Sequence, residues 1–314
     1  MLALEYYGST TVLASGTLVA NKFDNVIADY KYLHNLRFIM SAFELPKPYP
    51  KVQVKIPANV TREQLLSFIP FKNWLETLQE SMKLQSKEEE HPFHTIEERY
   101  TLRQIDVHAV EYFGSRIGFV LMETIVQNEA DSRPLAGIVF LRGGSVAILM
   151  ILRPLGDSTD RWVIMTQQPR IPAGSLRFFE IPAGMIDDQG TFVGAAATEI
   201  REETRITVPK HELVDMTQLA LKNSKNVEPH LKKAMYPSPG GCDEFIALFL
   251  WERRMSLREI KELEGKLTGN VKDREKIEVN LVKYEDLWRE GARDAKTLAA
   301  WALYENLTRE GSLK

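Results

Sequence analysis

Three glutamates at helical spacing are the residues of this chain best suited to chemistry. They are Glu199, Glu202 and Glu203. On an α-helix they would share an arc of roughly 100°, and carboxylates crowded on one face repel one another. A hard divalent cation such as Mg²⁺ prefers oxygen ligands and would relieve this repulsion. The alternative is a solvated acidic helix face that binds nothing.

The segments that precede the glutamates indicate how they are held. Residues 178–184 are typical of a strand that ends in a tight bend at Pro182-Ala183-Gly184. Residues 187–190 have the composition of a turn, and the alanines at 195–197 favour a helix. The predicted order is therefore strand, loop and helix, with the acids projecting toward the loop. Pro209 ends the segment.

This segment resembles the Nudix box, which reads Gly, five residues, Glu, seven residues, then Arg-Glu-apolar-any-Glu-Glu-any-Gly-apolar. The matching positions are Gly184, Glu199, Ile200, Glu202, Glu203 and Ile206. Three positions depart from the pattern, because Gly190 replaces a Glu, Thr198 the Arg and Arg205 the Gly. Arg205 lies three residues after Glu202, so we predict an ion pair between them that partly restores the missing positive charge.

Two further stretches resemble one group within that family. Residues 236–244 resemble the Ser-Pro-Gly-Gly loop of Nudix enzymes that cleave ADP-ribose and other nucleoside diphosphate sugars. Residues 165–170 resemble the strand end where those enzymes place an arginine on the substrate phosphates. Residues 70 to about 311 resemble the ADP-sugar diphosphatases, in particular the plant chloroplast form.

The resemblance implies hydrolysis of the diphosphate of an ADP-sugar, such as ADP-glucose or ADP-ribose, to AMP and a sugar phosphate. The implied metal ligands are the Ala183 carbonyl, Glu199, Glu202 and Glu203, holding Mg²⁺ or alternatively Mn²⁺. The implied substrate-binding residues are Arg170, Glu180, Gly240 and Gly241. The implied catalytic residues are Glu202, Glu244 and Glu275, and Glu275, in the acidic loop 265–276, is the predicted general base. A homodimer is also implied.

Two other functions remain as alternatives. The three departures from the box favour a non-catalytic Nudix-fold module that binds a nucleotide sugar and regulates another process. A pyrophosphatase acting on mRNA caps or nucleic acid is disfavoured, because no basic strip with interleaved aromatic residues lies near the box.

Composition sets outer limits on the class of protein. The net charge of −3 gives no general affinity for nucleic acid or for an anionic membrane. No apolar run approaches membrane-spanning length. The single cysteine, Cys242, excludes an internal disulfide and a cysteine zinc site. Residues 1–7 lack a basic secretory start, so we expect a cytoplasmic protein, with organelle targeting left open.

The chain is predicted to divide near residue 135. Residues 1–134 are expected to form a small α+β module that packs or dimerises, and they carry no catalytic signature. Its expected elements are a strand at 51–56, a helix opened by a Thr61–Gln64 capping box that ends before Pro70, a helix at 71–82, and strands within 100–128 that turn at Gly114. Residues 1–45 lie outside the resemblance.

Residues 135–314 are expected to form the Nudix domain. The predicted strands are 137–140, 145–152, 161–167, 244–251 and 277–282, and a terminal helix is predicted at 287–307. Strands on both sides of one functional helix, with a helix at the end, describe an α/β/α sandwich around a mixed sheet. The fold class is therefore α/β, with the smaller α+β module added at the N-terminus.

Overall fold

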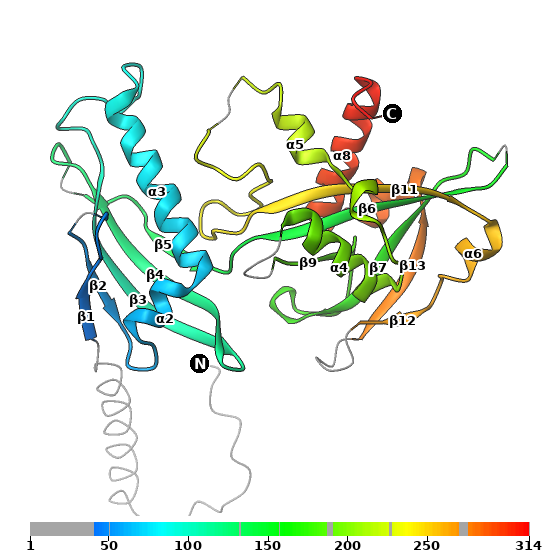
Figure 1. Cartoon of the computed structure of the whole chain (residues 1–314), viewed down its shortest axis with the longest axis horizontal. Helices are drawn as coiled ribbons and strands as arrows, with labels where there is room; N and C mark the ends of the chain where they lie inside the picture. Colours follow the sequence, from blue (N-terminus) through cyan, green and yellow to red (C-terminus); the bar gives the residue numbers. More distant parts are fainter. Residues whose placement is uncertain are drawn as a thin grey trace, which may run out of the picture.

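The structure is a computed structural model, and two units, each built on its own sheet, lie side by side in it (Figure 1). The residues that it describes are 41–49, 51–131, 133–156, 158–186, 191–225, 228–269 and 276–313. The predicted acid Glu275 and the box position Gly190 lie outside the described residues, as does the segment 1–40.

The first unit holds a five-stranded sheet in the order β1-β2-β3-β4-β5. Its strands are β1 (Ser41–Glu44), β2 (Gln53–Ile56), β3 (Thr101–Phe113), β4 (Arg116–Gln127) and β5 (Ile138–Leu141). β2 and β3 run parallel and the other neighbouring pairs are antiparallel. The predicted turn at Gly114 joins β3 to β4, and its φ of 64° is a left-handed conformation that glycine adopts readily.

Two helices cover one face of this sheet. The predicted capping box is confirmed, because Thr61 and Gln64 cap α2 (Arg62–Ser67) reciprocally. Pro70 lies inside the first turn of α3 (Ile69–Lys87) and not between the two helices. Proline is tolerated there because the first N–H groups of a helix have no partner within the helix. Phe71 and Leu75 of α3 are buried in the core of this unit, so this face of the helix packs within its own chain.

The strand predicted at 137–140 belongs to the first sheet and not to the second. It is β5, and its residues pair with β4, for example Leu121 with Phe140. The local sequence shows that the segment is extended, whereas its partner strand is set by packing. Gly143, with a φ of 86°, then turns the chain into the second unit. The first sheet thus extends beyond residue 134, and the functional division of the chain at 134/135 stays a prediction.

The second unit contains a mixed sheet in the order β10-β11-β6-β7-β13-β12, with β8 paired to β7 and β9 to β6. Its strands are β6 (Ser145–Pro154), β7 (Trp162–Arg170), β8 (Ser175–Glu180), β9 (Ala183–Met185), β10 (Val214–Asp215), β11 (Ile246–Met255), β12 (Leu267–Thr268) and β13 (Ile277–Lys283). β6 and β11 are parallel, and β6 and β7 are antiparallel. β6 is buried along nearly its whole length, as a strand covered on both faces must be.

Helices pack on both faces of this sheet. The helices are α4 (Phe192–Thr204), α5 (Met216–Leu221), α6 (Leu257–Lys261), α7 (Leu287–Glu290) and α8 (Ala295–Arg309), with short 3₁₀ turns at Ile171–Ala173, Lys210–Glu212 and Tyr284–Asp286. Alternate residues of β6 point to opposite faces. Ile148 packs with Ile200 of α4 on one face, and Leu149 packs with Tyr304 of α8 on the other. The predicted α/β/α sandwich with a mixed sheet is confirmed.

The terminal helix predicted at 287–307 is wrong in one respect, because it is two helices. α7 ends at Glu290, and α8 begins after Asp294, whose side chain accepts hydrogen bonds from the backbone N–H groups of Lys296 and Thr297. A capping aspartate starts a new helix in this way. No helix within the described part of the chain combines the length and apolar character needed to cross a bilayer.

Candidate functional site

Glu203 lies at the centre of the candidate site, on the buried side of α4. Its residue is 5% exposed. The Gln168 Nε2 group of β7 donates a hydrogen bond of 3.0 Å to Oε1, and the backbone N–H of Ala183 donates one of 3.0 Å to Oε2. Both carboxylate oxygens therefore have donors, and neither donor is a charged group.

Burial and neighbouring carboxylates raise the pKa of Glu203. The pKa of Glu203 is raised to about 8, mainly by burial; the carboxylates of Glu199 and Glu180 contribute to this rise, and the hydrogen bonds from Gln168 and Ala183 oppose it. With this raised pKa, the Glu203 carboxyl favours its protonated form unless a further positive charge lies nearby. A cation near Glu203 would favour its ionised form.

Glu199 is held against the backbone of the bend. A Cβ atom built on Gly184 would lie 1.8 Å from the carboxyl carbon of Glu199 and about as close to both of its oxygens, at 2.0 and 2.1 Å. Such distances are far inside atomic contact, so only glycine lets the carboxylate occupy this place. A side chain at position 184 would therefore displace the Glu199 carboxylate from the bend.

Glu202 differs from its two neighbours. Its side chain is 39% exposed and lies 4.0 Å from the Arg201 guanidinium. The structure thus brings Glu199 and Glu203 together at the bend and leaves Glu202 closer to solvent. Within the described residues, no three His, Cys, Asp or Glu side chains converge as a ready metal cluster.

The residues present nevertheless fit a divalent cation of the Mg²⁺ type. Mg²⁺ keeps several of its waters and is bound in proteins through one or two carboxylates together with substrate phosphates. Glu199 and Glu203 supply hard oxygen donors beside a cradle that a Cβ atom would fill. The assignment of Glu199, Glu202, Glu203 and the Ala183 carbonyl as ligands stays a prediction.

The predicted ion pair between Arg205 and Glu202 is wrong. Arg205 caps the C-terminus of α4 with a φ of 61°, and its Nη2 group donates a 3.0 Å hydrogen bond to the Gly269 carbonyl. Because this residue has left the helix in a left-handed conformation, the helical spacing on which the prediction depended no longer applies. It is the only non-glycine residue of the described ranges with a positive φ.

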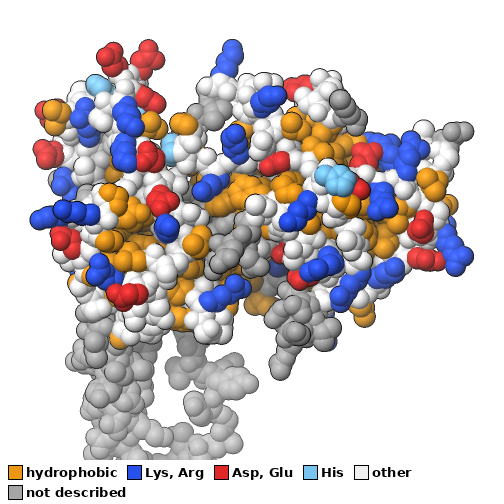
Figure 2. Space-filling view, in the orientation of Figure 1, with side chains coloured by type: hydrophobic (Ala, Val, Ile, Leu, Met, Phe, Trp, Pro, Cys, Tyr) orange, Lys and Arg blue, Asp and Glu red, His pale blue; other side chains and the backbone are white. Residues whose placement is uncertain are grey.

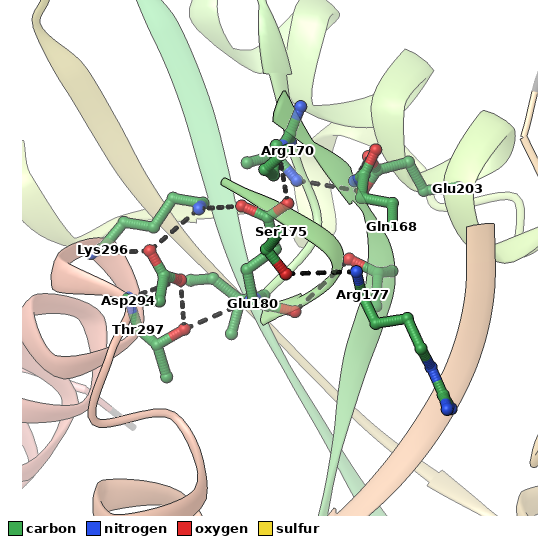
Figure 3. Close-up of polar contacts among 12 residues, drawn as sticks. Gln168, Arg170, Ser175, Arg177, Glu180, Glu203, Asp294, Lys296 and Thr297 are labelled. Carbon is green, nitrogen blue, oxygen red and sulfur yellow. Dashed lines mark hydrogen bonds and ion pairs between the residues drawn. The ribbon is translucent and has the colours of Figure 1, made fainter. Parts of the chain in front are cut away.

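A second group of charges surrounds Arg170 at the end of β7 (Figure 3). Its Nε group donates a 2.6 Å hydrogen bond to Oε1 of Glu180, whose side chain is 3% exposed. Lys296, from the first turn of α8, pairs with the other oxygen of Glu180 and lies 2.9 Å from Asp294. Two cations and two carboxylates thus alternate between β7 and α8.

This network is anchored to the backbone of the bend. Thr297 donates its hydroxyl hydrogen bond to Asp294 and accepts one from the Ile181 N–H at 3.2 Å. Since both oxygens of Glu180 have cationic partners, this carboxylate orients Arg170. A substrate contact of Glu180 itself stays a prediction.

Among the other predicted site residues, Glu244 has a different set of partners from Glu199 and Glu203. It accepts from the Arg142 guanidinium at 3.2 Å and from the Ser145 hydroxyl at 3.3 Å. Gly240 and Gly241 lie in the loop before β11 and line a cavity shared with α3 of the first unit. Their predicted contact with substrate, and the roles of Glu244 and Arg170, stay predictions.

Two residues of this site, Gln168 and Lys296, were not predicted from the sequence. Gln168 was inside the stretch 165–170, but nothing in that stretch indicates a partner on α4. Lys296 lies 116 residues after Glu180, with which it pairs. Only the capping pattern at Asp294 could have indicated that a helix begins there with Lys296 in its first turn.

Comparison with protein families matches residues 141–302 to the NUDIX domain. A relative from Arabidopsis thaliana, "Nudix hydrolase 14, chloroplastic", is 36% identical over 242 residues, which are 77% of this chain and 71% of the relative. The chain belongs to the Nudix family. A solved ADP compounds hydrolase is similar at a TM-score of 0.40 and 14% sequence identity, over 68% of this chain and 97% of that one.

Membership of the Nudix family supports hydrolase activity, and members of the family generally use divalent metal ions. The matched span begins at Leu141, the last residue of β5, so the Nudix domain is the second unit. The Arabidopsis relative is named as chloroplastic, and the cytoplasmic location expected for this chain stays a prediction.

Proposed function

We propose that this Nudix protein hydrolyses the diphosphate bond of an ADP-sugar, such as ADP-glucose or ADP-ribose, with Mg²⁺ or Mn²⁺ as cofactor. The observation that carries the proposal is the pairing of Glu199 with Glu203 at the Gly184 bend, beside the Arg170 network. The Glu203 charge also acts on Arg170. Carboxylates for a metal and a guanidinium for phosphate therefore lie within electrostatic reach of each other.

Each protein group has a physical role in such a reaction. When bound, the divalent cation would neutralise phosphate charge and polarise the phosphorus centre. Glu199 and Glu203 would hold it, and the Gln168 amide and Ala183 N–H fix Glu203. Arg170, oriented by Glu180, would hold phosphate oxygens with its guanidinium, which suits phosphate geometry better than an ammonium.

Removal of a proton from the attacking water requires a general base, which an ionised carboxylate can supply. Glu202 is one residue from buried Glu203, and its half-exposed carboxylate is paired only loosely with Arg201. We therefore place Glu202 as the first candidate for this role. Glu244 is already engaged by Arg142 and Ser145, and Glu275 remains the candidate from the acidic loop.

The choice of an ADP-sugar depends on the resemblance of residues 165–170 and 236–244 to enzymes of that group. We expect neither nucleic acid nor a membrane as partner, and we expect a homodimer. These expectations are independent of the carboxylate geometry, so the reaction can be tested first.

The test incubates the full chain with ADP-glucose, ADP-ribose and UDP-glucose plus Mg²⁺ or Mn²⁺, and resolves the nucleotide products by chromatography. We expect AMP from the ADP-sugars and its loss on chelation with EDTA, restored by added metal. Glu203→Gln should remove most of the activity, whereas Glu290→Gln, at an exposed position on α7, should keep it. Folded protein that releases no nucleoside monophosphate from any substrate would refute the proposal.

A regulatory binding module is the second candidate, favoured by Thr198 and Arg205 at box positions and by the lack of a preformed three-residue metal cluster among the described residues. The same incubation separates the two functions. A binding module returns the bound ADP-sugar intact after long exposure to metal, whereas an enzyme returns AMP.

A further inference from the structure

A cavity of about 380 Å³ lies between the two units of the chain. One wall comes from the junction of α2 with α3, around Pro70, and from the β3–β4 turn. The opposite wall comes from the Gly143-Gly144 turn before β6, from Met185 and Ile186 after the bend, and from Phe192 at the start of α4. Figure 2 shows hydrophobic side chains gathered on the middle of this face, with basic side chains beside them. We call this cavity the inter-unit pocket.

The charge of the inter-unit pocket is one-sided. Its described lining includes Arg116, Arg142 and Lys232 and contains no Asp or Glu. A concave site with several cations and no lining carboxylate attracts an anion. The volume lies at the lower end of the range for small-molecule sites, about 300–1,000 Å³.

Arg142 carries a specific sign of a missing partner. Its Nη1 group pairs with Glu244 at 3.2 Å, but its Nε atom is buried and has no hydrogen-bond partner. Buried polar groups in native proteins are nearly always satisfied. The Nε atom is enclosed by protein, whereas the Arg142 side chain as a whole is 32% exposed and lines the pocket, where its guanidinium can meet an anion.

The lining also contains aromatic side chains. It includes Phe68, Phe113, Phe192 and Phe245. The rings of Phe192 and Phe245 lie 6.0 Å apart at 50°, and Phe113 is 44% exposed. Aromatic side chains bury flat apolar rings favourably. Together, these rings and the cations match an anion that carries a planar ring, which is the chemistry of a nucleotide.

The inter-unit pocket and the candidate site use adjacent residues of one backbone segment. Met185 and Ile186 of its wall follow directly after Gly184, against which the Glu199 carboxylate packs. The Ile186 N–H donates a 3.1 Å hydrogen bond to the Gly144 carbonyl, which fixes this wall to the turn before β6. A molecule with its diphosphate at Glu199 and Glu203 could therefore extend into the pocket.

We propose that the inter-unit pocket binds the nucleoside monophosphate half of the substrate, with the base among the phenylalanines and the phosphate side near Arg142 and Lys232. This inference rests on the proposed function for the identity of the substrate. It assigns a binding role to a different part of the protein, namely the junction between the first and second units. The first unit thereby takes part in substrate recognition.

The test measures AMP binding to the full chain by titration calorimetry without added metal. Lys232→Ala is compared with Lys233→Ala, because the two exposed lysines are adjacent and only Lys232 lines the pocket. Ser115→Trp, at an exposed lining position, fills the pocket without touching the core. We expect Lys232→Ala to weaken AMP binding about five- to tenfold, Ser115→Trp to abolish it, and Lys233→Ala to leave it within twofold.

Kinetics with the ADP-sugar complete the test. AMP should inhibit competitively, and Lys232→Ala should raise KM by about the factor by which it weakens AMP. Unchanged AMP affinity in Lys232→Ala and Ser115→Trp, or non-competitive inhibition, would overturn the inference even if hydrolysis is found. Loss of AMP binding in these variants without hydrolysis of any sugar nucleotide supports the nucleotide pocket and refutes the enzymatic proposal.

Discussion

Replacement of Lys296 by methionine tests whether the network around Glu180 stabilises the second unit. Lys296 pairs with both Glu180 and Asp294, and the side chains of the three are only 13%, 3% and 6% exposed. The change removes one cation and leaves two carboxylates with Arg170 as their remaining cationic partner among these residues. Methionine keeps much of the apolar stem, so the loss is mainly electrostatic.

The expected magnitude follows from burial. Removing one partner of a buried ion pair costs about 3–5 kcal/mol, because an uncompensated charge stays away from water. Arg170 is 40% exposed at its side chain and can still compensate Glu180 in part. We therefore expect a loss of about 3 kcal/mol in the free energy of unfolding.

Arg258→Met supplies the matched control. Its ion pair with Glu262 spans 2.8 Å, close to the 2.9 Å between Lys296 and Asp294, but the side chains are 88% and 55% exposed. An exposed pair of this kind contributes about 0.3–0.5 kcal/mol. The two variants thus share the bond length and the new residue, and differ in burial.

Urea unfolding followed by tryptophan fluorescence measures both variants. Four of the five tryptophans lie in the second unit and only Trp74 lies in the first, so the signal reports mainly on the unit that contains Lys296. The free energy comes from linear extrapolation with the same slope for all three proteins. If Lys296→Met loses no more stability than Arg258→Met, the network is not a buried electrostatic anchor and the argument is refuted.

Three further predictions concern the candidate site. Gly184→Ala should abolish AMP release while the far-UV circular dichroism stays native, because the new Cβ would overlap the Glu199 carboxylate; retained activity would show that this carboxylate is not needed in its present place. Arg170→Lys should raise KM for the ADP-sugar at least tenfold, or about 1.4 kcal/mol, since an ammonium cannot make two parallel bonds to phosphate, and an unchanged KM would count against Arg170. The free energy of unfolding in urea should be about 1 kcal/mol higher for Arg205→Gly than for Arg205→Ala. Both variants lose the hydrogen bond to Gly269, but only glycine adopts the left-handed conformation without strain. Equal stabilities would contradict the presence of that strain.

The role of the first unit changes once the structure is considered. The sequence of residues 1–134 contains no catalytic pattern, so it predicts only a module that packs or dimerises. In the structure, α2, α3 and the β3–β4 turn form one side of the inter-unit pocket. A segment without catalytic residues can therefore take part in substrate choice.

Local patterns determined much of this protein in advance. The spacing of Glu199, Glu202 and Glu203 with Gly184 identified the box, and runs of alternating or continuous apolar residues located most strands. The capping box at Thr61 was also readable. These features depend on neighbours a few residues apart, and the physical rules that govern them act within one helix or one turn.

Tertiary structure alone decided the contacts that join distant segments. Lys296 meets Glu180 across 116 residues, Gln168 meets Glu203 across 35, and β5 pairs in the first sheet although it precedes the second. The sequence alone does not select these pairings, because an extended or helical segment could pair with many other segments before the cores form. Packing of the cores selects one partner for each segment. This packing decides which cations face the carboxylates, and it also forms the pocket between the two units.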